Sequence, residues 1–139
     1  MKSAMIRMIG KGGAMVLALS AGLAMAGDVK VTLSGANEVP PVTTTAAGTG
    51  MFTIGTDMSV SGSITTTGVK GTAAHIHEAA AGANGPVIVP LTKDGDKYST
   101  AAGAKLTEAQ YKSFLAGNLY VNVHSEANKP GEIRAQLKP

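Results

Sequence analysis

The chain contains three histidines, and two of them are separated by a single residue. His75 and His77 lie in the alternating segment 72–78, and His124 ends a second alternating segment, 119–124. Side chains at positions i and i+2 of a strand point to the same side, about 7 Å apart, so both imidazoles of a His-x-His pair can reach one ion. Three neutral imidazoles suit copper or zinc and leave one coordination position open. These histidines are the candidate metal ligands.

The alternation of apolar and polar residues predicts on which face of each strand the histidines lie. Ile76 stands on the opposite face from His75 and His77, and Val123 stands on the opposite face from His124. If the apolar faces point into a core, all three histidines point away from it. They then meet only where the two strands lie close together in the sheet.

A carboxylate beside a ligand imidazole can fix its orientation by accepting its second N–H. Segments 119–124 and 132–137 are predicted to form a hairpin, which places Glu132 near His124. Glu132 is therefore a candidate for orienting that imidazole. The alternative is a solvated charge beside Arg134.

The elements that must position these residues are short strands. Abundant Thr, Val and Gly with alternating polarity predict an all-β chain in which glycines supply the turns. The economical fold is a Greek-key antiparallel β-sandwich of about seven to eight strands. The strands are expected at residues 29–33, 49–54, 59–65, 72–78, 86–91, around 98, 119–124 and 132–137.

One segment has the pattern of a helix instead. Thr107 and Gln110 have the spacing of a capping box, in which each side chain bonds the other residue's backbone N–H. An apolar stripe that includes Phe114 follows, and Gly117 can take the left-handed conformation that ends a helix. The sequence predicts one short crossover helix over about residues 108–116.

The first 26 residues differ in composition from the rest. They carry Lys2, Arg7 and Lys11 without an acidic residue, then a charge-free apolar run that ends in Ala24-Met25-Ala26. This is the pattern of a cleaved secretory signal peptide, and the run is short for a membrane span. We expect a signal peptide at 1–26, one domain at 27–139, a periplasmic or secreted location, and no stable membrane insertion after cleavage.

Net charge and cysteine content exclude further classes of function. The chain has 12 basic and nine acidic residues, and three of the basic ones lie in the first 26, so segment 27–139 is formally neutral. A neutral domain with few aromatic residues is a poor nucleic-acid binder. The absence of Cys excludes disulfides and thiolate ligands, and no Gly-x-Ser-x-Gly or phosphate-loop motif is present.

Five segments of the sequence, in order, carry a family resemblance: 33–42, 74–77, 84–87, 120–124 and 130–134. They resemble the CHRD domain over about residues 30–138. This module occurs in chordin, an extracellular antagonist that binds growth factors, and in many small exported bacterial proteins. The resemblance implies a β-sandwich. It also suggests an alternative function, that of a non-catalytic extracytoplasmic protein-interaction module without metal.

A second resemblance concerns the histidine segments alone. Residues 75–78 and 121–126 are similar to the two copper-ligand strands of copper–zinc superoxide dismutase. The likeness implies copper binding, but a fourth histidine and the enzyme's disulfide are missing here. The first hypothesis is therefore a copper or zinc site made by His75, His77 and His124. The interaction module is second and a dismutase-like oxidoreductase third, so the expected partner is a metal ion or an extracytoplasmic protein.

Overall fold

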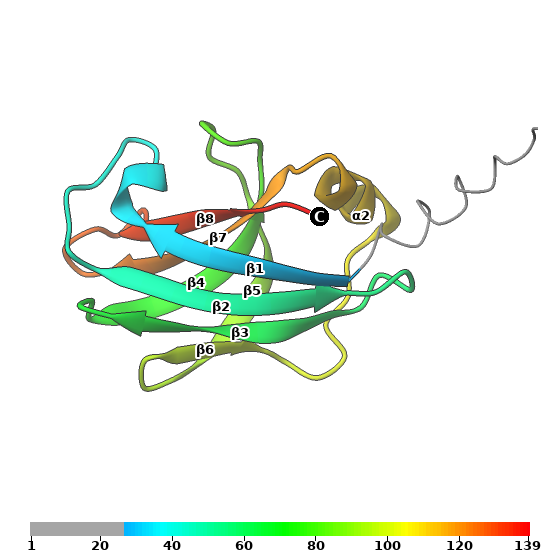
Figure 1. The fold of residues 1–139 in the computed structure, drawn as a ribbon, viewed down its shortest axis with the longest axis horizontal. Helices are drawn as coiled ribbons and strands as arrows, with labels where there is room; N and C mark the ends of the chain where they lie inside the picture. The colour runs from blue at the N-terminus through cyan, green and yellow to red at the C-terminus, as the bar shows by residue number, and fades with distance from the viewer. Residues whose placement is uncertain (1–26) are drawn as a thin grey trace, which may run out of the picture.

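Alternating apolar residues build eight antiparallel strands in the computed structural model, which describes residues 27–139 (Figure 1). The predicted signal peptide at 1–26 lies outside the described residues. The strand number and the all-β class agree with the sequence prediction. The strands are β1 (Gly27–Ser34), β2 (Ala47–Ile54), β3 (Val60–Thr67), β4 (Gly71–Glu78), β5 (Val87–Asp94), β6 (Lys97–Thr100), β7 (Leu119–Ser125) and β8 (Ile133–Leu137).

The strands form a closed barrel in the order β1-β2-β3-β6-β5-β4-β7-β8. Strands β4, β5 and β6 are a meander, and β7 returns to lie beside β4, which is a Greek-key connection. The prediction of a two-sheet sandwich is wrong, because β8 also pairs with β1 at Arg134 and Ser34 and closes the sheet. Alternation and turn spacing are the same in both architectures, so the sequence pattern did not distinguish them.

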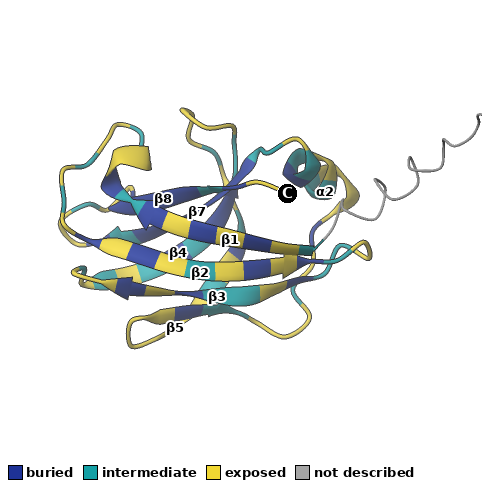
Figure 2. Cartoon of the chain, viewed as in Figure 1, coloured by how far each residue is buried: buried dark blue, intermediate teal, exposed yellow. Residues whose placement is uncertain are grey.

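The interior of the barrel is filled by one face of every strand. Along β1 and β2, buried and exposed residues alternate, as the banding in Figure 2 shows. Leu33, Phe52, Ile64, Ile76 and Val121 are completely buried in this core. Burying large apolar side chains in this way is the main source of stability in such a domain.

Strands β7 and β8 are buried on both faces (Figure 2). Two segments cover their outer face: the one after β1, which begins with the short 3-10 helix η2 (Gly35–Asn37), and the one between β4 and β5. The side chain of Asn37 donates to the Arg134 carbonyl, and that of Gln136 donates to the Ala79 carbonyl. The polar residues that alternate with the core therefore form a second buried layer.

Helix α2 (Glu108–Leu115) connects β6 to β7 at one end of the barrel (Figure 1). Its capping box is present: Thr107 Oγ1 accepts from the Gln110 N–H at 3.1 Å, and Gln110 Oε1 accepts from the Thr107 N–H at 2.9 Å. Phe114 is fully buried against the core. The predicted helix is confirmed. Of the helices within residues 27–139, none combines the length and apolar character needed to span a membrane.

Candidate metal centre

The three histidines meet on the outer face of β4 and β7. These strands are antiparallel neighbours, in a register that sets His75 opposite Asn122 and His77 opposite Tyr120. Each histidine offers one ring nitrogen, and the three nitrogens lie within 4.8 Å of one another. The strand adjacency that sequence alternation left open is therefore present. Ile76 and Val123 point into the core, as predicted.

Backbone carbonyls fix the orientation of two of the rings. Nδ1 of His77 lies 2.9 Å from the Gly85 carbonyl oxygen, and Nδ1 of His124 lies 2.7 Å from that of Lys129. A carbonyl oxygen only accepts, so each Nδ1 carries the proton and donates it. In the neutral form of each ring, Nε2 then has a free lone pair, which is what a metal ligand requires.

The third ring contacts the second directly. Nδ1 of His75 lies 3.0 Å from Nε2 of His124. Because Nε2 of His124 has no proton, the Nδ1–H of His75 donates to it. Movement of that proton to Nε2 of His75 would leave Nδ1 free to face an ion. The three donors would then be Nδ1 of His75 and Nε2 of His77 and His124.

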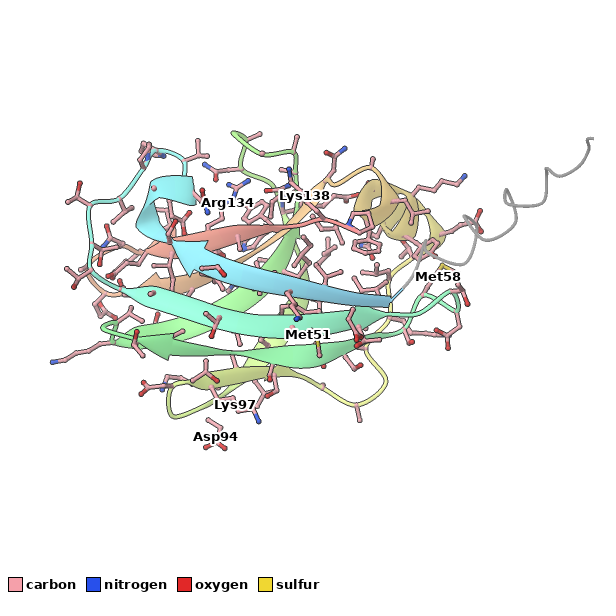
Figure 3. The ribbon with its side chains drawn as sticks, in the orientation of Figure 1. Met51, Met58, Asp94, Lys97, Arg134 and Lys138 are labelled. Carbon is pink, nitrogen blue, oxygen red and sulfur yellow. The ribbon has the colours of Figure 1, made fainter. Side chains whose placement is uncertain are left out.

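His77 is the most deeply placed of the three. It is 7% exposed, and its Nε2 atom is buried without a hydrogen-bond partner among residues 27–139. Its ring is stacked on Tyr120, with centroids 4.7 Å apart and planes 3° from parallel. Arg134, labelled in Figure 3, lies on β8. Its guanidinium carbon is 3.5 Å from the centroid of the same tyrosine ring. Stacking and the Gly85 hydrogen bond together hold Nε2 in place.

Burial favours the neutral form of two of the histidines, His75 and His77. It lowers the pKa of His75, and the neighbouring His124 and His77 lower it further. Burial also lowers the pKa of His77 and outweighs the hydrogen bond to the Gly85 carbonyl, which acts in the opposite direction. Both imidazoles are thus neutral at pH 7 and available to a cation without losing a proton to solvent.

The structure places Glu132 away from the role suggested for it. Its carboxylate is 8% exposed and accepts from Ser125 Oγ and Thr44 Oγ1, both at 2.6 Å, and from Asn128 Nδ2 at 3.3 Å. The hydroxyl of Ser125, followed by that of Thr44, lowers the pKa of this carboxyl. Within residues 27–139 Glu132 forms no hydrogen bond with an imidazole, and it is not a solvated charge either. Strand β8 begins one residue later, so the strand alternation does not extend to it.

Sequence reasoning missed the groups that support the histidines. Tyr120 and Asn122 share a face with His124, so alternation could have indicated them. The carbonyls of Gly85 and Lys129 carry no side-chain signal. Glu38, which follows η2, is 4% exposed and reaches the Asn122 amide with its Oε2 atom, 3.4 Å from Nδ2. Burial raises the pKa of Glu38, although the hydrogen bond from Asn122 and the charge of Arg134 lower it.

Comparisons with known proteins give one finding. A family model described as the CHRD domain matches residues 29–137, a span that includes all three histidines. Neither the curated proteins nor the solved structures give a significant match. The match covers nearly all of the described residues.

Proposed function

The chain belongs to the CHRD domain family, and on that premise we propose that it is an exported module that holds one copper or zinc ion between His75, His77 and His124. CHRD domains are generally extracellular, which supports a periplasmic or secreted location. A site built without thiolates suits an oxidising compartment, where free cysteines are readily oxidised.

The observation that carries the proposal is the convergence of three imidazole nitrogens within 4.8 Å. Two of the rings have their tautomer set by backbone carbonyls, which is how protein metal sites orient ligand imidazoles. Metal–nitrogen bonds are about 2 Å long, so two nitrogens on one ion lie at most about 4 Å apart. The rings therefore have to move together by less than about 1 Å to share one ion. An all-imidazole set favours Cu or Zn over Mg or Ca, which take oxygen ligands.

The test is a titration of the purified protein with Cu(II), followed by electron paramagnetic resonance and by calorimetry. We expect one ion per chain, with a spectrum that shows nitrogen coupling. His75→Ala combined with His124→Ala should abolish that signal. Met51→Ala is the control, because Met51 carries an exposed thioether on β2, outside the cluster. A wild-type protein without a nitrogen-coupled signal at one equivalent of copper would contradict the proposal.

The second candidate function is a protein-interaction module that needs no metal. It is favoured by family membership and by a groove of about 690 Å³ over the β1–β8 junction, between η2 and the segment after β4. Lys30, Lys138 and Arg134 line the groove together with Glu38. Affinity capture from an extracytoplasmic extract, with and without a chelator, separates the two functions. A stoichiometric partner retained in the presence of the chelator would favour the module.

A dismutase-like oxidoreductase is the third candidate, supported by the resemblance of residues 75–78 and 121–126 to the copper-ligand strands of copper–zinc superoxide dismutase. It predicts that the copper-loaded protein consumes superoxide faster than the same amount of free copper. A fully loaded but inactive sample would leave metal binding in place and remove this activity.

A further inference from the structure

Asn122 lies next to the three histidines, on the same outer face of β4 and β7. It lies in β7 opposite His75 and between Tyr120 and His124 in the chain, and its side chain is 2% exposed. A buried amide normally has hydrogen-bond partners for both its oxygen and its nitrogen. In Asn122 the side-chain nitrogen has two hydrogen-bond acceptors, whereas the side-chain oxygen has no donor among residues 27–139.

Its nitrogen faces two oxygen acceptors. Nδ2 lies 3.4 Å from Oε2 of Glu38 and 3.3 Å from the Pro130 carbonyl oxygen. Both are acceptors, so the NH2 group must be on this side and Oδ1 must be on the other. Gly131 makes this packing possible, because a Cβ there would collide with both Asn122 Nδ2 and Glu38 Oε2. The orientation of the amide is thus decided by chemistry as well as by shape.

Its oxygen is a buried acceptor without a donor. Among residues 27–139, two buried side-chain polar atoms have no hydrogen-bond partner: Oδ1 of Asn122 and Nε2 of His77. The two side chains are neighbours. Asn122 stands directly opposite His75 and diagonally opposite His77 in the β4–β7 pair, on the same face of the sheet. They cannot satisfy each other in the neutral protein, because the His77 proton is on Nδ1 and both facing atoms are acceptors.

Two buried acceptors therefore lie side by side without a donor from residues 27–139, and a cation bound to both would satisfy them. We infer that Oδ1 of Asn122 is the fourth ligand of the ion held by His75, His77 and His124, so that the site is N3O. This inference rests on the proposed function and adds a ligand that the histidine pattern does not contain. An amide oxygen is a hard donor that suits Zn(II) and Cu(II), whereas Cu(I) prefers sulfur ligands. Asn122 thereby makes the site selective for the divalent ions.

The first test leaves the protein unaltered. Uniformly labelled wild-type protein is titrated with Zn(II) alone, and the Asn122 side-chain carbonyl carbon and NH2 resonances are followed by NMR together with the histidine ring signals. We expect all of them to move together and to stop moving at one equivalent. Histidine signals that move while those of the Asn122 side chain stay unchanged would overturn the inference and leave the proposed function intact.

The second test compares the affinity of the protein for divalent ions, Zn(II) and Cu(II), with its affinity for monovalent Cu(I). Asn122→Ala should weaken Zn(II) and Cu(II) binding by about 10- to 100-fold, the range seen when a group supporting a metal site is removed. The same variant should change Cu(I) affinity much less, measured anaerobically against a chelating competitor. Asn84→Ala is the control. The Asn84 side chain donates to the Val39 carbonyl and accepts from Arg134 in the same outer layer. Within the described residues it forms no hydrogen bond with the three histidines.

These measurements distinguish failure of the Asn122 ligand from failure of the three-histidine site itself. Equal Zn(II) affinity in Asn122→Ala and wild type, with Asn84→Ala also unchanged, would overturn the inference alone. Wild-type protein that binds neither Zn(II) nor Cu(II) would overturn the proposed function, and the inference with it. If Asn122→Ala fails to fold, the wild-type NMR titration still decides the question.

Discussion

Nδ1 of His75 lies 3.0 Å from Nε2 of His124, although 49 residues separate the two in the chain. The contact exists because β4 and β7 are antiparallel neighbours in the barrel. Since Nδ1 of His124 donates to the Lys129 carbonyl, Nε2 of His124 must accept from His75. An ion bound at the cluster would be coordinated by these same two nitrogens. Metal binding would therefore replace the hydrogen bond between the two imidazoles by two metal–nitrogen bonds.

A change of tautomer at His75 follows from this relationship. We expect His75 to be protonated on Nδ1 in the metal-free protein and on Nε2 after one equivalent of Zn(II). His77 and His124 should keep their Nδ1 protons throughout, because the Gly85 and Lys129 carbonyls hold them. Long-range ¹⁵N–¹H correlation spectra of the rings distinguish the tautomers. A metal-free His75 that already carries its proton on Nε2 would contradict the prediction.

The stability of the metal-free protein should fall in mild acid. The pKa values of His75 and His77 are lowered from 6.5, so below that pH the unfolded chain binds more protons than the folded one. The free energy of unfolding is then highest above about pH 6.5 and decreases as the pH falls through the folded-state values. Urea denaturation at a series of pH values from 7.5 to about 5 measures the slope.

The control for this pH effect is His77→Gln, which removes one titrating ring. Glu38 acts in the opposite direction, because its raised pKa gives stability at low pH that is lost as the pH rises. Its contribution is common to both proteins and cancels in the difference. If the free energy of unfolding changes with pH equally in wild type and His77→Gln, then His77 does not contribute to the loss of stability in acid.

Gly131→Ala should damage both the fold and the site. The residue has φ of +137°, a conformation that favours glycine, and a Cβ would collide with Asn122 and Glu38. We expect a loss of about 1–3 kcal/mol from backbone strain alone and weaker Zn(II) binding in addition. Gly95→Ala is the comparison, since Gly95 also has positive φ but open space around it. Equal Zn(II) affinity in the two variants would show that Gly131 has no effect on the site.

Glu132→Ala should lower stability without altering the metal centre. The change removes the acceptor of the Ser125 and Thr44 hydroxyls and of the Asn128 amide, which should cost about 1–3 kcal/mol. Because backbone carbonyls orient His77 and His124 instead, the Cu(II) spectrum should match that of the wild type. Thermal unfolding and electron paramagnetic resonance on one sample measure both effects. A changed nitrogen coupling would restore Glu132 to the orienting role.

The sequence by itself determined the local features of this protein. Alternation assigned His75, His77 and His124 to outward faces, since successive side chains of a strand point to opposite sides. The Thr107–Gln110 spacing predicted helix α2, because a capping box is complete within four residues. Each of these depends on interactions between residues that are close in the chain, which a single sequence displays directly.

Only the tertiary structure decided which strands are neighbours and what covers them. Closure into a barrel depends on the pairing of β8 with β1 and of β3 with β6, between residues far apart in the chain. The partners that orient the rings are carbonyls, which every residue has, so no residue type reveals them. Within the described residues, the buried oxygen of Asn122 is unpaired only because Glu38 and Pro130 bind its nitrogen. The chain folds these distant groups together to bury its core, and the proposed donor set is a result of that packing.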